Sequence, residues 1–379
     1  MHLASPFLRL LARLVLVVSF AASLVASAWE VIHFDIYTKA IDFGYFRAYA
    51  LVVSSHGWQA YYAPAYVTQS LPLNINPPLL ALWLFPFLPF SPQVGFAIWT
   101  FLSLLALALA WWLTGNRKPW QLPLLALFFP VVYNLLLGQP VLFIALIVVI
   151  AWWLSEHDRA LLGGAVLSLA TIKPQLIFLV PLVLLLAGRW RFFAGFAVAS
   201  VALLALSVAL VGTAGVTQMI ANQHYVLLHA KDNWLIPSTV LTLLLPGLPG
   251  LILDALLSCF IVVLAWRARH APLSVLFALG LLSSLLLAPY LHPQDLALWA
   301  IAALLIARSI AIPPLLLALG VFATWSWIIL SGILFAPLVP HLAWVPLVPL
   351  VSFLGILLIA RSLFAAPSPS HLGAVAQAP

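Results

Sequence analysis

Charged side chains are scarce in this sequence. Only 6% of the 379 residues are Asp, Glu, Lys or Arg, whereas 65% are hydrophobic and the mean hydropathy is +1.19. Soluble globular proteins carry roughly 25% charged residues, so this composition excludes a chain whose whole surface faces water. Apolar runs of about 20 residues recur along the chain, and each can cross the ~30 Å hydrocarbon core of a bilayer. We therefore expect an all-α polytopic membrane protein.

Cysteine and nucleotide-binding motifs are also lacking. The single cysteine, Cys259, lies inside an apolar run, which excludes an intramolecular disulfide and a thiolate metal site. The Walker loop, the dinucleotide fingerprint and the nucleophile elbow are absent. The net charge of +7 comes from short basic turns that form no basic face, so we expect no nucleic acid partner. Any chemistry must draw on membrane lipids and on substrates that the membrane supplies.

The apolar runs predict about 11 to 13 spanning or partly spanning helices. We expect them to form one integral-membrane domain, residues 1–365, followed by a disordered tail, residues 366–379. Segment 7–28 is expected to be the first span, although the arginines before it and the small residues at its end also fit a cleaved signal peptide. Basic turns held on the cytoplasmic side of the plasma (inner) membrane then place both termini in the cytoplasm. The polar turns fall outside, namely residues 29–76, 134–139, 173–175, 224–232 and 292–295.

Several apolar stretches are too short or too rich in proline for full spans. Between the first loop and the first basic turn, the predicted sidedness requires an odd number of crossings, yet two apolar stretches lie there. Either the proline-rich stretch 77–90 does not cross completely, or the hairpin 121–154 is partly re-entrant. Segments 160–172 and 176–187 are also short. Such broken helices are tolerated where they line a cavity inside the protein instead of facing lipid.

The first extracytoplasmic loop, residues 29–76, holds three of the eight acidic residues of the chain. Asp42 is surrounded by aromatic side chains such as Tyr45 if this segment is helical, and we expect it to be a catalytic base. Asp35, one or two turns earlier, is the alternative base. A solvated loop carboxylate is the plain explanation for either residue. Arg47 in the same segment is a candidate anion contact.

Two later turns carry the other charged candidates. Lys173 lies between two apolar segments and precedes a proline, and a lysine there suits a phosphate group because it is a point charge with three donors. Its alternative is to extend toward the interface, where its charge is solvated. His292 and Asp295 suit a substrate hydroxyl or a phosphate group, and a solvated turn between helices explains them equally well.

Asn134, Gly138 and Gln139 form a polar turn in an otherwise apolar hairpin. Helix packing through polar side chains and a glycine turn explains this motif as well as a substrate contact does. The two histidines and the aspartate of the loop 213–238 match no familiar ligand spacing, so we expect no metal site.

The polar motifs occur in a fixed order between residues 35 and 200. They are Asp42-Phe43 with Tyr45 and Ala48, Gly57, Tyr61, Asn76-Pro77-Pro78, Asn134 with Gly138-Gln139, Gly163-Gly164-Ala165, Lys173-Pro174 and Arg189-Trp190-Arg191. This set resembles glycosyltransferase family 87, a GT-C family also named DUF2029. The resemblance thins after residue 200, where His292-Pro293 and Asp295 fit as a later element.

The resemblance implies a GT-C-like helical bundle without a large soluble domain. It also implies transfer of a sugar, usually mannose, from a polyprenyl-phosphate donor to a lipid or glycan acceptor at the extracytoplasmic face, with an acidic base that corresponds to Asp42. A lipid phosphate is already a competent leaving group, so a single inverting displacement requires one carboxylate and donors for the departing phosphate, but no cofactor or metal. The expected phosphate contacts are Lys173, Arg47 and His292. The expected cavity residues are Tyr45, Asn134, Gly138, Gln139, Gln175 and Asp295.

A transporter or lipid flippase is the main alternative function, because broken helices and buried ionisable groups also suit transport. Two features argue against it. The two halves of the sequence show no internal repeat, and the polar groups gather at one membrane face instead of the midplane. A structural subunit of an envelope complex is a further alternative, in which the polar motifs would be incidental.

Overall fold

The computed structural model describes residues 14, 41–66, 73–115, 121–126, 128–228, 248–288, 291–310 and 347–364. Every element along these residues is an α-helix or a 3-10 helix, which confirms the predicted all-α class. The expected first span 7–28, apart from residue 14, lies outside the described residues, as do the alternative base Asp35 and the expected tail 366–379.

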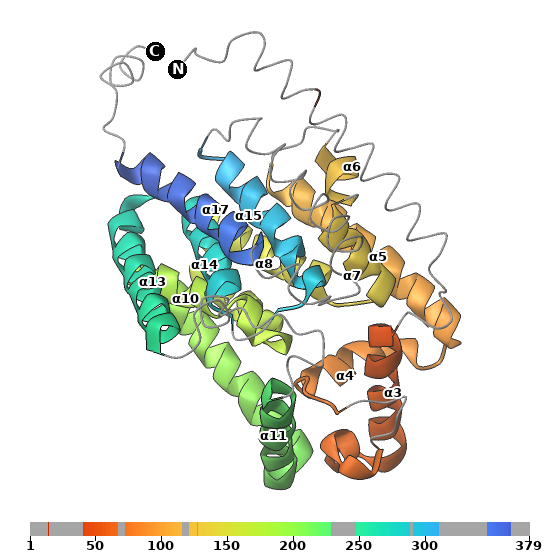
Figure 1. Cartoon of the computed structure of the whole chain (residues 1–379). Coiled ribbons are helices and arrows are strands. Elements are labelled where there is room, and N and C mark those ends of the chain that lie inside the picture. The colour runs from red at the N-terminus through yellow and green to blue at the C-terminus, as the bar shows by residue number, and fades with distance from the viewer. Residues whose placement is uncertain are drawn as a thin grey trace.

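The first loop folds into short helices beside the bundle (Figure 1). The α4 helix has six residues and a length of about 9 Å at 1.5 Å per residue, far less than a bilayer core. The helix in the stretch 77–90 is therefore too short to span a bilayer core by itself. The elements of this region are α3 (Ile41–His56), η1 (Trp58–Tyr62), η2 (Pro64–Tyr66), α4 (Leu79–Leu84) and η3 (Phe85–Phe87).

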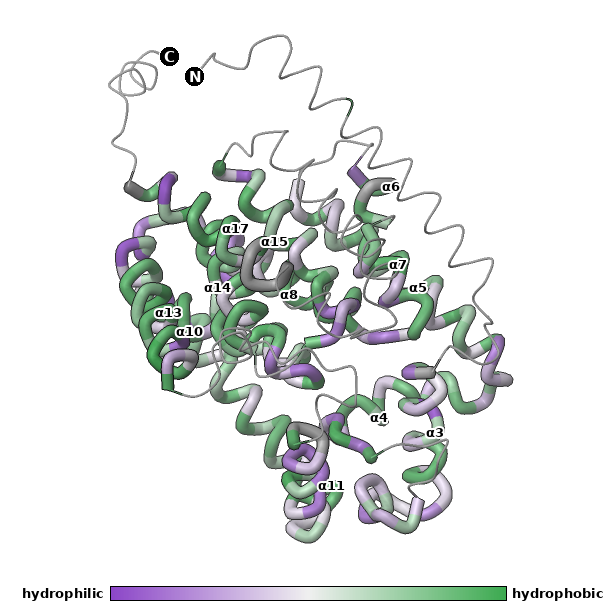
Figure 2. Tube along the Cα trace, in the orientation of Figure 1, coloured by the Kyte–Doolittle hydropathy of each residue, from purple (hydrophilic) through white to green (hydrophobic). Residues whose placement is uncertain are grey.

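Three described helices are long and apolar enough to cross a bilayer: α5 (Pro92–Leu113), α11 (Trp190–Leu228) and α13 (Leu248–Arg267). A fourth span is possible if α7 (Phe129–Leu137) and α8 (Val141–Glu156) count as one, although they bend by 119° at the polar turn between them. Hydrophilic residues concentrate at helix ends, and α3 in the first loop carries more of them than the apolar α4 (Figure 2). The chain is therefore a polytopic membrane protein.

The core of the bundle surrounds α8, which packs against α5, α9 and α14. The shorter apolar helices pack around it (Figure 1). Small residues allow close approach between α9 and α11, because a Cβ at Gly164 would overlap the carbonyl oxygen of Phe192. These elements are α6 (Gln121–Ala126), α9 (Ala160–Leu167), η4 (Ser168–Ile172), η5 (Pro174–Leu176), α10 (Leu179–Leu186), η6 (Ala268–His270), α14 (Leu273–Leu287), η7 (Pro293–Ala297), α15 (Leu298–Ala307) and α17 (Leu347–Phe364).

The prediction of a polar loop over residues 213–238 is wrong for the first part of this segment. Helix α11 bends at Gly212, where φ is 72° and ψ is 175°, and then continues as a helix to Leu228. Glycine adopts this positive φ without a steric penalty, so the chain turns sharply at Gly212 and resumes a helix directly after it. The segment after the bend packs against η1 and is joined to the first loop by the Asn222 side-chain amide, which donates to the carbonyl of Asn74 at 3.0 Å.

Candidate active site

Asp42 lies in the first turn of α3, where its side chain is half-buried. The Nε2 group of Gln139 donates a hydrogen bond of 2.7 Å to Oδ2 of Asp42. Burial raises the pKa of Asp42, and the hydrogen bond from Gln139 opposes this rise, together with smaller effects of His292 and Lys173. A carboxylate with a raised pKa binds a proton more strongly and is therefore suited to accept one.

The polar turn between α7 and α8 fixes the position of Gln139. The Asn134 side chain donates to the carbonyl of Gln139 at 2.9 Å, and the backbone N–H of Gln139 donates to the carbonyl of Asn134 at 3.1 Å. Gly138 has φ +70° and ends α7 in the left-handed conformation. A Cβ at this position would lie 2.5 Å from Cβ of Phe43, the neighbour of Asp42. The turn and α3 are therefore in direct contact.

A second group of charges comes from two other interruptions of the helices. Lys173 joins η4 to η5 with non-helical backbone angles (φ −135°, ψ 74°), and its Nζ forms an ion pair of 2.8 Å with Oδ1 of Asp295. The backbone N–H of His292 donates to Oδ2 of the same carboxylate at 2.9 Å. Lys173 is 6% exposed and Asp295 is fully buried. An ammonium group has three donors and Asp295 accepts one of them, so Lys173 is held in place with donor capacity to spare.

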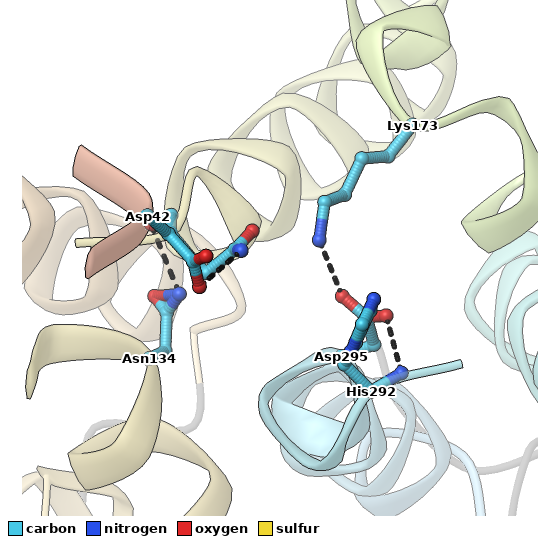
Figure 3. Close-up of polar contacts among 6 residues, drawn as sticks. Asp42, Asn134, Lys173, His292 and Asp295 are labelled. Carbon is cyan, nitrogen blue, oxygen red and sulfur yellow. Dashed lines mark hydrogen bonds and ion pairs between the residues drawn. The ribbon is translucent and has the colours of Figure 1, made fainter. Parts of the chain in front are cut away.

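The two groups face each other across the site. Helix α7 packs against η7, and Figure 3 shows the side chains of Asp42 and Asn134 on one side and those of Lys173, His292 and Asp295 on the other. Asp42 interacts electrostatically with His292, Lys173 and Asp295. Burial lowers the pKa of His292, which favours its neutral form, and the Asp295 carboxylate opposes this effect. The structure thus brings together four predicted external turns that are far apart in the sequence.

Other predicted site residues are placed differently. Arg47 is turned about 140° around α3 from Asp42 at 3.6 residues per turn. Its guanidinium donates to the carbonyls of Leu88 and Phe90 at 3.3 and 2.9 Å, so the structure does not bring it to the charged groups of the site. Tyr45 is half-buried on the next turn of α3 after Asp42.

Gln175 and Asp295 are more enclosed than cavity-lining residues are expected to be. Gln175 is buried in η5 at 8% exposure, and both carboxylate oxygens of Asp295 are occupied by protein donors. Asp295 therefore positions Lys173 instead of offering a free oxygen to a substrate hydroxyl.

Gln294 was not predicted from the sequence. It is 2% exposed, and its Oε1 has no hydrogen-bond partner among the described residues. The only signal for Gln294 in the sequence was its position between the candidate residues His292 and Asp295.

No metal-binding cluster is formed within the described ranges, where no three or more His, Cys, Asp or Glu side chains converge. His224 is exposed on α11, while the second histidine and the aspartate of the predicted loop 213–238 lie outside the described residues.

The sequence model of glycosyltransferase family 87 matches residues 74–312. The chain belongs to this family. The match includes the turn at Asn134, Lys173 and the His292–Asp295 segment, and it extends well beyond the residue at which the resemblance was expected to thin. It begins after Asp42, so the role of this residue depends on the geometry alone. No curated protein and no solved structure is similar enough to this chain to count as a match.

Membership of glycosyltransferase family 87, together with the apolar spans, makes this chain a membrane glycosyltransferase. Membership of this family suggests a lipid-linked sugar donor and an acceptor as the substrates in general. The assignment favours the enzyme over the transporter and the structural subunit that the composition alone left open.

Proposed function

We propose that the protein transfers a sugar, with mannose as the first candidate, from a polyprenyl-phosphate donor to a lipid or glycan acceptor at the extracytoplasmic face of the plasma membrane. The observation that carries this proposal is the pairing of Asp42 with the Lys173, His292 and Asp295 group in one site. A carboxylate on one side and a cation on the other are what a single displacement at a sugar phosphate requires.

In the proposed reaction, Asp42 takes the proton of the acceptor hydroxyl as its oxygen attacks the anomeric carbon of the donor. The bond between that carbon and the phosphate oxygen breaks, and its electron pair leaves with the polyprenyl phosphate. Attack from the face opposite the phosphate inverts the anomeric configuration. A single carboxylate suffices, in contrast to the carboxyl pair of glycoside hydrolases.

The departing phosphate gains negative charge as this bond breaks. Lys173 supplies a fixed positive charge for it, because Asp295 holds the ammonium group in place at 2.8 Å. His292, whose pKa is lowered by burial so that the neutral imidazole is favoured, offers a further hydrogen-bond donor to the phosphate. These residues stabilise the transition state through positions that exist before the substrate arrives, so little reorganisation is needed.

The test is sugar transfer from a radiolabelled polyprenyl-phosphate sugar in membranes that contain the native protein or the Asp42→Asn variant. Loss of the base is expected to lower the rate by about 100-fold or more, because general base catalysis contributes 10²–10⁴. Asp158→Asn is the matched control, since Asp158 lies in an exposed turn with φ 60°, which asparagine also tolerates. Asp35→Asn is measured in parallel. Equal transfer by the native protein and Asp42→Asn would remove Asp42 from the mechanism.

A further inference from the structure

The hydrogen bond between Gln139 and Asp42 uses only one oxygen of the carboxylate. Gln139 donates to Oδ2 at 2.7 Å, within the range of charge-assisted hydrogen bonds, and no hydrogen bond from the described residues reaches Oδ1. A carboxyl group can rotate about the bond to its Cβ, and one strong donor on one oxygen fixes that rotation. The second oxygen is then presented in a defined direction.

Gln139 is a poor choice for packing alone. It is 5% exposed, and its Oε1 is buried without a hydrogen-bond partner among the described residues. The same is true of Oδ1 of Asn134, which holds the backbone of Gln139. Buried acceptors without partners destabilise the folded state, and an apolar side chain of similar size would avoid this cost. Such exceptions in native proteins call for an explanation, and a functional role is one.

We propose that Gln139 is a positioning residue for the base: it holds Asp42 through Oδ2, so that Oδ1 is the oxygen that receives the proton of the acceptor hydroxyl. The backbone of Gln139 is fixed in turn by the paired hydrogen bonds with Asn134 and by Gly138, which has no room for a side chain against Phe43. This role rests on the proposed function.

The surroundings of Asp42 make the effect of Gln139 measurable. Burial raises the pKa of Asp42, and the Gln139 hydrogen bond is the largest effect that lowers it. The charged or titratable groups that act on Asp42 through space are His292 and Lys173, which lower the pKa, and Asp295, which raises it. The other elements packed against α3, namely η1, α4, η3 and α7, contain no Asp, Glu, Lys, Arg or His, and their titratable side chains are the tyrosines Tyr61, Tyr62 and Tyr133. Removal of the amide donor therefore raises the pKa of the base.

The experiment compares the full-length protein with Gln139→Met and Gln139→Glu, reconstituted in lipid, and measures kcat and KM for transfer from polyprenyl-phosphate mannose between about pH 5 and pH 9. A base must be deprotonated to act, so kcat rises with pH through its pKa. In Gln139→Met the rising limb of the kcat profile is expected to shift to higher pH by about one to two units. On the acidic side kcat is expected to be about 10- to 100-fold lower than in the native protein, and at alkaline pH it should recover. In Gln139→Glu the added negative charge shifts the rising limb still further toward high pH.

The donor KM is expected to change less than threefold, because Gln139 does not hold the phosphate. Gln93→Met, at an exposed position in the first turn of α5, is the matched control and should keep the native pH profile. A uniform loss of kcat at every pH, with the limb unmoved in both Gln139 variants, would overturn the positioning role while the native enzyme still transfers sugar. Absence of transfer by the native protein would instead overturn the proposed function, and this role with it.

Discussion

At the scale of single residues, the buried ion pair between Lys173 and Asp295 determines how the site carries charge. A lysine at 6% exposure between apolar helices would be strongly disfavoured without a counter-ion. Asp295 supplies the counter-ion and is itself satisfied by the backbone N–H of His292. In the proposed reaction this pair provides the buried cation for the phosphate, and the stability of the protein depends on both partners.

Asp295→Asn is expected to lower the free energy of unfolding by about 3–5 kcal/mol, because it leaves Lys173 as an uncompensated buried charge. Thermal unfolding in detergent would show this as a lower Tm. The double variant Lys173→Met with Asp295→Leu should recover much of the lost stability, since two apolar side chains replace the pair, yet it should not recover sugar transfer. An Asp295→Asn variant with the Tm of the native protein would contradict this stabilising role of the ion pair.

At the scale of elements, the turn between α7 and α8 holds the side chain of Asp42, the proposed base. It bends two apolar helices by 119°, ends α7 in a left-handed glycine and presents Gln139 to α3. The sequence alone left this motif undecided between a packing turn and a substrate contact. The contacts support a third role, in which the turn packs against α3 and orients its carboxylate.

Gly138→Ala is expected to reduce sugar transfer by about tenfold or more and to lower the Tm, because the new Cβ meets Phe43 in addition to the cost of a positive φ. Gly188→Ala is the matched control. Gly188 has φ +78° and no atom within 4 Å of an added Cβ, so it carries the backbone strain of about 1–2 kcal/mol without the collision. Equal losses of activity in the two variants would mean that contact with α3 is not what matters.

At the scale of the whole molecule, the turns predicted to be cytoplasmic and the turns predicted to be external meet at two different places. Arg308 donates to the carbonyl of Thr114 and lies 4.7 Å from the ring centre of Trp152, so parts of three elements that end in predicted cytoplasmic turns meet. The predicted external turns meet around Asp42 and Lys173 instead. This separation is what alternating crossings require, while the sidedness itself stays a prediction.

Labelling of single cysteines with a membrane-impermeant maleimide in intact cells tests the sidedness. In a Cys259→Ser background, Ser54→Cys on α3 is expected to react from outside, and Arg191→Cys at the start of α11 only after the membrane is opened. Both positions are exposed, so unequal reactivity would reflect the side of the membrane and not burial. Reaction of Arg191→Cys in intact cells would place the site, and with it the proposed acceptor, in the cytoplasm.

The sequence by itself determined the helical class, the membrane environment and the family, because hydrophobic run length, charge scarcity and motif order are local properties of the chain. It also located Asp42, Lys173, His292 and Asp295 as unusual polar residues in apolar surroundings. Only the tertiary structure decided their partners. Gln139 reaches Asp42 across 97 positions and Asp295 reaches Lys173 across 122, while Arg47 turns to neighbouring carbonyls. Such pairings depend on how helices bend and pack, which periodicity along one helix does not specify.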